Sequence, residues 1–465
     1  MAPRTATTEE EILTIFPQDF SDLDLSFTSS SASTSSFAAS ARSSLSLSLP
    51  SFASSSSSLI KPLPHHSSDP RWSAVRAAAN LSPNGALQLR HLKLLRYLGS
   101  GNLARVFLCR LRGFDDDDPN LEFALKVVDL NAASSAVEDR VSHVRAEARA
   151  LAGLDHPFLP TLYARLDASH YACFLIDYCP GGDLHSLLLR CPGHRLPLRA
   201  ARFYAAEVLL ALEYLHALGF VYRDLKPENV LLRADGHVML SDFDICFHSD
   251  VAPALHRLPR RRKSAFGLSN CLSLLQGKHE GVDIEFVAEP ESAFSRACVG
   301  THEYLAPEIA SGVGHGNGVD WWAFGVFVYE LIYGRTPFKG GSKEATLRNI
   351  LVGELKFPNG SAEDSRRASA AAAKDLISRL LERDPGRRMG IVKGASEIKR
   401  HRFFRGVQWP LIRNIMPPVV LGQTACATVA AVGKFWRERR RLWAWKWSRR
   451  SINQAKRLFI NRRRD

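Results

Sequence analysis

The sequence predicts an α+β protein with two lobes, a small lobe built on an antiparallel β-sheet and a larger, mainly α-helical lobe. Short apolar runs bounded by turn residues, such as "RVFLCRL" and "FALKVVDL", are typical of strands. The later segments "HVRAEARALAGL" and "RAARFYAAEVLLALEYLHALG" carry apolar residues three and four apart, which is the helical period. A cleft between two such lobes is a common place for a ligand.

Composition narrows the class of protein. Hydrophobic residues at 45% and charged residues at 23% of 465 describe a globular chain of two or three domains. The net charge of +14 favours acidic partners, namely membrane lipids, nucleic acid or phosphorylated ligands. The cysteines show no CxxC spacing and the N-terminus does not resemble a signal peptide, so we expect an intracellular protein. The longest nearly apolar run, Val419 to Gly433, is shorter than the roughly twenty residues that span a bilayer.

The first element in chain order is a leader, residues 1–90. Between residues 27 and 58 it consists mainly of Ser, Ala and isolated Leu, with almost no charge and no lasting period. Such a segment cannot offset the entropy lost on ordering. We expect the leader to be mostly disordered, either as a carrier of phosphorylation sites or as an inert tether.

Periodic structure starts at "LRHLKLLRYLGS" and predicts a small lobe over residues 91–176 and a large lobe over 177–406. The turn in "LGSGNLARVFL" has glycines that let backbone amides approach phosphates. Ala104 replaces the third glycine of the usual pattern, so a plain hairpin turn is the alternative. The candidate phosphate-binding residues of this turn are Gly99, Ser100, Gly101, Asn102 and Val106.

The strand "FALKVV" places Lys126 among apolar neighbours, where an ammonium group needs a charged partner or ligand. Glu147, on the following helix, is the partner we nominate. In phosphoryl transfer such a pair holds the α- and β-phosphates of ATP. A solvated lysine at a sheet edge is the alternative.

The strongest motif is "YRDLKPENVLL", residues 222–232. It supplies Asp224 to accept or orient a hydroxyl proton, Lys226 to steady the transferring phosphoryl group, and Asn229 to bind a metal ion. Shortly after it, "LSDFD" adds Asp242, a hard oxygen ligand suited to Mg²⁺ that bridges phosphates.

With these motifs in order, residues 91–406 resemble the eukaryotic protein kinases, which implies a bilobal protein kinase fold that uses ATP and Mg²⁺. "GTHEYLAPE" resembles the substrate-positioning segment, with Thr301 where Ser/Thr-specific kinases carry it. The resemblance also implies that Glu308 pairs with Arg388 and that Asp320 braces the catalytic loop.

The loop "DFD" followed by a long insertion resembles the plant AGC VIII kinases, most nearly the PINOID and WAG branch. This implies Ser/Thr phosphorylation of proteins, with the hydrophilic loops of PIN auxin efflux carriers as substrates. Asp244 replaces the usual glycine but leaves the metal ligand Asp242 in place. By the same resemblance the hinge runs from Asp177 to Cys179, where backbone groups read adenine, and Asp183 lies near the ribose.

Two features depart from that pattern. Ala297 stands where AGC kinases carry a phosphorylatable Ser or Thr, so Arg223 lacks its expected phosphate and activity is constitutive or depends on Ser295. A C-terminal Phe-x-x-Phe motif is absent after Pro418. The changes at 104, 244 and 297 support an alternative function, that of a pseudokinase scaffold. We disfavour this alternative because none of the changes removes a group that would contact the metal ion or the transferred phosphoryl group.

Two basic segments remain. The insertion at about 247–297 is an irregular stretch that contains "HRLPRRRKSAF" and is too long for an ordinary connection. The extension 407–465 ends in a tail in which Trp443, Trp445 and Trp447 alternate with Arg and Lys. Such a tail suits an anionic membrane, with nucleic acid or a solvated tail as alternatives.

We expect a cytoplasmic monomer with peripheral plasma-membrane association, and a nuclear pool as the alternative.

Overall fold

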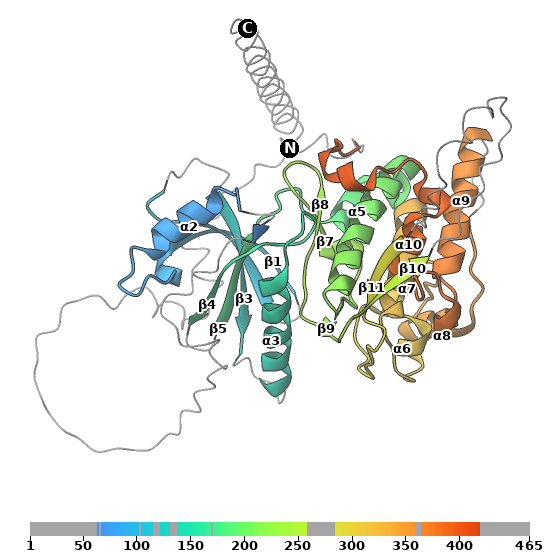
Figure 1. The fold of residues 1–465 in the computed structure, drawn as a ribbon, viewed down its shortest axis with the longest axis horizontal. Coiled ribbons are helices and arrows are strands. Elements are labelled where there is room, and N and C mark those ends of the chain that lie inside the picture. The colour runs from blue at the N-terminus through green and yellow to red at the C-terminus, as the bar shows by residue number, and fades with distance from the viewer. Residues whose placement is uncertain are drawn as a thin grey trace, which may run out of the picture. The chain divides into compact units, whose positions relative to one another are not determined.

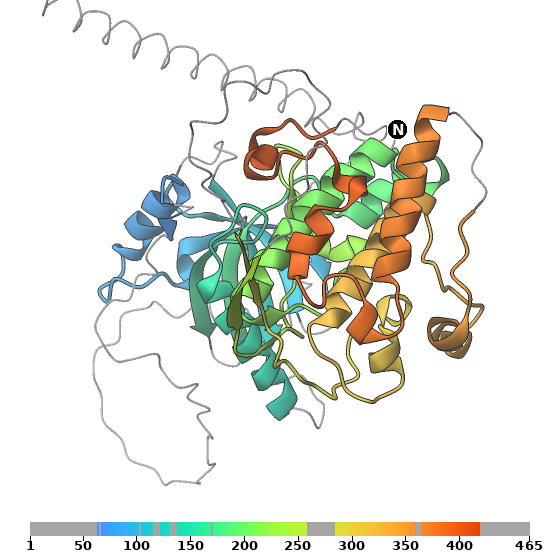
Figure 2. The same ribbon diagram turned by 45° about the vertical axis from the view of Figure 1, so that its right-hand side comes forward.

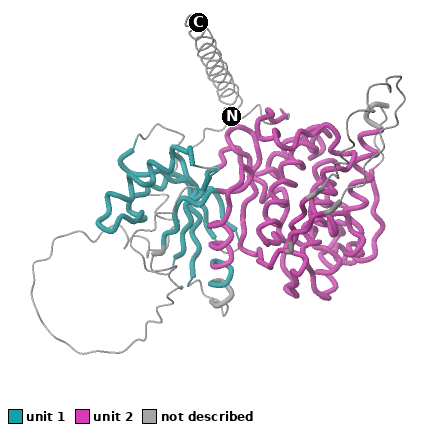
Figure 3. Tube along the Cα trace, viewed as in Figure 1, with its two compact units in different colours: residues 1–144, 161–178 teal, residues 145–160, 179–465 magenta. Residues whose placement is uncertain are grey.

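The computed structural model describes residues 63–64, 67–101, 104–114, 121–130, 137–168, 171–257, 284–358 and 364–418. It divides the chain into two compact units, residues 1–144 with 161–178 and residues 145–160 with 179–465 (Figure 3). The main division after Tyr178 lies close to the predicted lobe boundary after Ile176. The early leader, the middle of the insertion (258–283) and the Trp-rich tail lie outside the described residues.

The first unit contains a five-stranded antiparallel sheet of order β1-β2-β3-β5-β4 (Figure 1). The runs that predicted strands form β2 and β3, which confirms the small β lobe. In the register of β2 and β3, Val106 lies opposite Lys126. The bounds are β1 Leu92–Ser100, β2 Ala104–Leu111, β3 Glu122–Asp129, β4 Leu162–Ala168 and β5 Tyr171–Asp177.

A helix that the sequence analysis missed completes this unit. Helix α2, Arg71–Ala79, lies within the predicted leader, so the expectation of disorder up to residue 90 is wrong for residues 67–90. Trp72 is 3% exposed and its ring centroid lies 5.1 Å from that of Tyr163 in β4. The apolar face of α2 belongs to the core of the unit, which explains why so short a helix is ordered.

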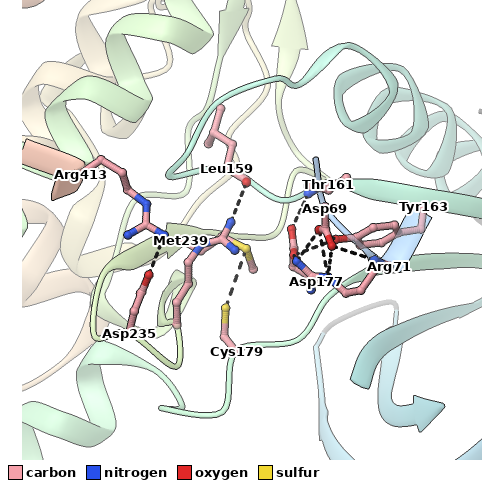
Figure 4. A network of polar contacts seen from close by, with 11 residues as sticks. Asp69, Arg71, Leu159, Thr161, Tyr163, Asp177, Cys179, Asp235, Met239 and Arg413 are labelled. Atoms are coloured by element: carbon pink, nitrogen blue, oxygen red, sulfur yellow. Dashed lines mark hydrogen bonds and ion pairs between the residues drawn. The ribbon is translucent and has the colours of Figure 1, made fainter. Parts of the chain in front are cut away.

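A buried ion-pair network ties the start of α2 to the end of β5 (Figure 4). Arg71 Nη2 lies 2.8 Å from Asp177 Oδ1 and 2.7 Å from Asp69 Oδ2. The Tyr163 hydroxyl donates to Asp69 Oδ2 at 2.7 Å, and the Thr161 amide donates to Asp177 Oδ2 at 2.8 Å. Both carboxylates are therefore paired and hydrogen-bonded.

The second unit is mainly helical, as predicted. Helix α7 is apolar on all sides and buried along most of its length, which makes it the central helix of the unit. It packs against α5 and α9 (Figure 2). The bounds are α4 Leu184–Arg190, α5 Leu198–Ala217, α6 Pro307–Ala310, α7 Gly318–Tyr333, α8 Lys343–Val352, α9 Asp364–Leu380 and α10 Gly394–Lys399. Helix α3, Val137–Gly153, is divided between the units after Val144.

Three two-stranded sheets accompany these helices. They pair β6 (Phe220–Val221) with β9 (Phe247–His248), β7 (Val230–Leu232) with β8 (Val238–Leu240), and β10 (Ala252–Arg257) with β11 (Ile284–Glu289). The last pair corrects the expectation of an irregular insertion. Its two ends form an antiparallel ladder in which Ala252 lies opposite Glu289.

Two further contacts hold the second unit together. Arg388 donates to both carboxylate oxygens of Glu308, at 2.6 and 2.9 Å, which confirms the predicted pair. The start of the C-terminal extension is anchored where Arg413 Nη2 lies 2.6 Å from Asp235 Oδ2 (Figure 4). In the part of the chain that the structure describes, no helix has the length and apolar character needed to cross a bilayer.

Candidate active site

The loop that follows β6 carries the strongest sequence motif, and Asp320 of α7 braces it. The Asp320 carboxylate accepts the backbone amides of Tyr222 and Arg223, each at 2.8 Å. Arg223 has a φ of 68°, a conformation that a non-glycine residue adopts only when its surroundings hold it there. The predicted bracing role of Asp320 is therefore confirmed.

Four side chains converge beyond this point to form what we call the Asp224 cluster: Asp224, Lys226, Asn229 and Thr301. Lys226 Nζ donates to Asp224 Oδ2 at 2.7 Å, and Asn229 Nδ2 donates to the same oxygen at 2.8 Å. The Thr301 hydroxyl donates to Asp224 Oδ1 at 3.1 Å and accepts from Lys226 Nζ at 3.0 Å. Asp224 is 8% exposed and Asn229 7%, so the cluster is largely screened from solvent.

Gly300 allows the Thr301 segment to approach the loop. Its φ is 112°, and a Cβ there would lie 3.1 Å from the Arg223 carbonyl oxygen. A side chain at this position would be strained and tight against the backbone. Glycine before Thr301 is thus a requirement of the close approach.

Asn229 and Asp242 are the candidate metal ligands. Asn229 turns its amide nitrogen to Asp224, donating to the carboxylate and to the backbone carbonyl at 2.9 Å, so its amide oxygen points away. Asp242 has a φ of 61°, another held conformation. No group of three or more His, Cys, Asp or Glu residues in the described segments forms a metal cage. An amide oxygen and a carboxylate are hard oxygen donors of the kind that Mg²⁺ takes as ligands.

The second aspartate of "DFD" is compatible with this loop. The non-glycine residues of positive φ in the described segments are His194, Arg223 and Asp242, so Asp244 does not need the freedom of glycine. Burial lowers the pKa of Arg223, and the carboxylate of Asp244 is among the groups that oppose this shift. Asp244 therefore adds a negative charge close to Arg223.

Arg223 is held by a backbone carbonyl, a hydroxyl and an aromatic ring. Its Nε donates to the Ile245 carbonyl at 2.6 Å, and its Nη1 donates to the Ser295 hydroxyl at 3.3 Å. The guanidinium also lies 4.6 Å from the centroid of the Phe247 ring. Ser295, rather than Ala297, supplies the side chain from the segment where a phosphorylatable residue was expected.

Most nucleotide-binding candidates of the first unit lie on β1, β2 and β3 and in the turn that joins β1 to β2. The turn closes with a hydrogen bond from the Gly101 amide to the Ala104 carbonyl at 2.9 Å, so alanine at 104 is accommodated. A Cβ at Gly99 or Gly101 would meet no atom of the described residues within 4 Å. Ser100 ends β1, and Lys126 is 9% exposed; Asn102 lies outside the described residues.

Glu147, the nominated partner of Lys126, belongs to the part of α3 in the second unit and is 3% exposed. Burial raises the pKa of Cys246 to about 12, and the Glu147 carboxylate adds to that rise. Glu147 therefore lies near Cys246, in the segment that follows the "DFD" sequence.

Three other candidates have structural partners. Asp177 is 1% exposed and its carboxylate is used by the ion-pair network with Arg71. Cys179 is buried, and its thiol lies 3.8 Å from the Met239 sulfur (Figure 4). Asp183 is the N-cap of α4 and accepts the Ser186 amide and hydroxyl, each at 2.7 Å, so both of its oxygens are engaged.

Sequence reasoning missed two buried residues beside the loop. His216, near the end of α5, contacts Asp320 at 2.8 Å and Glu289 at 2.7 Å. No motif links these positions, because their partners are 73 and 104 residues away in the chain. The signal available in the sequence was His216 itself, a polar residue on an otherwise apolar face of the helix predicted there.

Comparison with known proteins agrees with this geometry. The sequence profile of the protein kinase domain matches residues 92–256 and 281–404. The chain is 53% identical over 403 residues to serine/threonine-protein kinase WAG1 of Arabidopsis thaliana, covering 85% of this chain and 82% of that protein. It is 56% identical over 412 residues to WAG2 of the same plant, covering 86% and 83%. Identity to protein kinase PINOID of Oryza sativa subsp. japonica is 50% over 372 residues, covering 78% and 76%. The pseudokinase alternative receives no support from these similarities.

Proposed function

Because this chain belongs to the protein kinase family, as a serine/threonine kinase of the PINOID and WAG branch, we propose that the Asp224 cluster performs its phosphoryl transfer. The γ-phosphoryl group of ATP would pass to serine and threonine hydroxyls of proteins. The observation that carries this proposal is the convergence of a lysine, an amide and a hydroxyl on one carboxylate.

Each member of the cluster has a role in this proposal. Asp224 orients the attacking hydroxyl and accepts its proton, a contribution typically worth ~10²–10⁴-fold in rate. Lys226 steadies the negative charge of the transferring phosphoryl group. Thr301 bonds to both residues and so fixes their separation.

Asn229 and Asp242 are the residues that would hold Mg²⁺, through the amide oxygen and the carboxylate. Bound by these residues, Mg²⁺ would supply positive charge to offset that of the phosphates. Chelation with EDTA is expected to abolish phosphate transfer and added Mg²⁺ to restore it. Transfer that continues in EDTA would contradict this assignment.

We assign nucleotide contacts to the turn at Gly99–Gly101, with Val106 beside it, and to Lys126, with Glu147 as the partner of that lysine. Backbone groups of Asp177 and Cys179 are assigned to the adenine edge. These assignments rest on membership of the kinase family and on the buried positions of Lys126 and Glu147. The proposed contact of Asp183 with ribose would compete with its role as the cap of α4.

Transfer of radiolabelled phosphate from ATP to a generic basic protein tests the proposal. Asp224→Asn is expected to lower kcat by about a hundredfold or more, because it removes the base. Asp250→Asn is the matched control, since it makes the same change at an exposed carboxylate of the same unit. Equal transfer by Asp224→Asn and the wild type would contradict the role of Asp224.

The substrates we propose are the hydrophilic loops of PIN auxin efflux carriers, which would place the enzyme in auxin transport. The support is the similarity to PINOID and WAG kinases. Purified PIN loops and the generic basic protein are to be compared as substrates at equal concentration. A kcat/KM for the loops no higher than for the basic protein would argue against this substrate class.

We also propose a cytoplasmic enzyme, monomeric, that associates peripherally with the plasma membrane through its basic tail. Each basic residue near an anionic surface adds about 1 kcal/mol of attraction. Flotation with phosphatidylserine vesicles, with and without residues 434–465, tests the tail. Equal binding by both forms would remove the tail from this proposal, and tighter binding to nucleic acid than to vesicles would favour a nuclear pool instead.

A further inference from the structure

We propose that Glu289 is a positioning residue, through which the end of the insertion holds the catalytic loop in place. Glu289 is the last residue of β11, the strand by which the insertion returns to the large unit. The inference rests on the proposed function of the Asp224 cluster. It adds a residue that the kinase motifs do not contain.

One oxygen of the Glu289 carboxylate has two hydrogen-bond partners in a buried site. Its Oε2 lies 2.7 Å from His216 Nδ1 and accepts from Asn317 Nδ2 at 2.9 Å. Glu289 and Asn317 are each 3% exposed, and His216 is completely buried. A buried carboxylate costs free energy unless it is paired in this way, so the arrangement is specific.

His216 transmits the contact to the loop. Its other ring nitrogen, Nε2, lies 2.8 Å from Asp320 Oδ2, the carboxylate that accepts the amides of Tyr222 and Arg223. The path therefore runs from β11 through one imidazole and one carboxylate to the residues directly before Asp224. Every step in it is a hydrogen bond of less than 3 Å.

Two carboxylates on the two ring nitrogens require a doubly protonated imidazole, because each nitrogen must donate. Burial alone would lower the pKa of His216, but Glu289 from β11 and Asp320 from α7 outweigh it and raise that pKa to about 10. The Trp321 ring packs against the imidazole, with 4.6 Å between the ring centroids. The imidazolium links two negative charges that would otherwise repel each other.

Close packing leaves Glu289 little freedom to move. Helix α10 begins at Gly394 with a φ of 54°, and a Cβ at that position would collide with the Glu289 carboxylate. Strand β11 also packs against α5 and α10. A displacement of β11 therefore has to move His216 or break its bond, which couples the insertion to the loop.

Three variants of the full-length protein test the inference. Glu289→Ala removes the contact and is expected to lower kcat about tenfold at pH 8.5, with the KM values for ATP and peptide within twofold of the wild type. Glu289→Gln keeps the shape but removes the charge, so its loss of kcat is expected at pH 8.5 and not at pH 6.5, where His216 is protonated again. Glu291→Ala, an exposed carboxylate two residues on, is expected to behave as the wild type.

Activity is to be expressed per folded molecule, measured by active-site titration, so that a misfolded fraction does not count. An unchanged kcat in Glu289→Ala, or a loss in Glu289→Gln that is the same at both pH values, would overturn the inference. If the wild type shows no transfer that depends on Asp224, the proposed function fails first. The two failures are thus distinguishable.

Discussion

Arg223 has three direct contacts in the loop that it helps to form. Its guanidinium bonds to the Ile245 carbonyl and the Ser295 hydroxyl and lies over the Phe247 ring. These contacts are with neutral groups, and the Asp244 carboxylate adds a negative charge nearby. The 3.3 Å bond to Ser295 is the only one of them that a side-chain substitution removes without altering the ring.

We predict that Ser295→Ala lowers kcat about fivefold, because a hydrogen bond of this kind is worth ~1 kcal/mol. The measurement is phosphorylation of a peptide by wild-type and variant protein after phosphatase treatment, so that only the hydroxyl contributes. Ser292→Ala, whose exposed hydroxyl bonds to Ser249 and the Asp250 carbonyl, is the control. Unchanged peptide phosphorylation by Ser295→Ala would leave a constitutively active enzyme with no role for this residue.

The proposed catalytic residues could be named from the sequence because they are close to one another along the chain. Asp224, Lys226 and Asn229 lie within one short loop, and their residue types limit the chemistry. The roles of Asp177 and Glu289 were not predictable, because their partners lie far away in the chain. A motif records which side chains a reaction needs, whereas the contacts that orient them depend on the fold.

Helix α2 is held in the first unit by charge as well as by packing. Arg71 is the partner of Asp177, whose side chain is fully buried, while the exposed Arg76 lies on the opposite side of the helix. Removing one partner of a buried pair leaves an uncompensated charge. The contribution of Arg71 to stability therefore exceeds that of a surface arginine.

Arg71→Met is expected to lower the free energy of unfolding by about 3 kcal/mol, the lower end of the range for broken buried pairs, because Arg71 is itself 20% exposed. Urea denaturation of the full-length protein measures this change. Arg76→Met, at the exposed arginine of the same helix, is expected to stay within ~0.5 kcal/mol of the wild type. Equal effects of the two substitutions would show that the network with Asp177 does not stabilise the unit.

The elements that sequence analysis predicted were the long or strongly periodic ones, such as α5 and the strands β2 and β3. Helix α2 has nine residues, too few to be stable without tertiary contacts, so its order depends on the burial of Trp72. The β10–β11 pair was missed because Pro253 and the long intervening segment do not suggest a strand. Whether a short helix or strand forms depends on tertiary packing, which the local sequence pattern does not reveal.

At the scale of the whole molecule, the sequence predicted two lobes and assigned residues 145–160 to the small one, which spanned 91–176, but the structure groups them with the other unit. They belong to the helical unit, although they lie between strands of the sheet. The Tyr214 hydroxyl accepts the Asp155 amide at 3.0 Å, the Phe158 carbonyl accepts the Leu240 amide at 2.9 Å, and the Leu159 carbonyl accepts from Arg233 at 3.1 Å. These partners all lie far along the chain, in the helical unit.

The pH dependence of global stability follows from His216. Its pKa in the folded protein is raised to about 10 from an ordinary value near 6.5, so the folded state binds the proton more tightly than the unfolded chain does. The resulting stabilisation is complete below about pH 6.5 and is lost as the pH rises through about 10. Buried thiols such as Cys246, with a pKa raised to about 12, change stability in the same direction at still higher pH.

The contribution of His216 can be isolated by comparing the pH dependence of stability in the wild type and in Glu289→Gln. Other ionisable groups, such as the buried thiols, titrate alike in both proteins and cancel in the difference. In the variant only Asp320 remains as a charged partner, so the pKa of His216 falls and its stabilisation disappears at lower pH. Urea midpoints measured from about pH 6.5 to 9.5 are expected to decline in the wild type. The difference between the two proteins is expected to narrow toward the alkaline end, as the pH approaches the pKa of about 10 of the wild-type imidazole. A difference that stays constant over this range would mean that Glu289 stabilises the molecule by packing and not by charge.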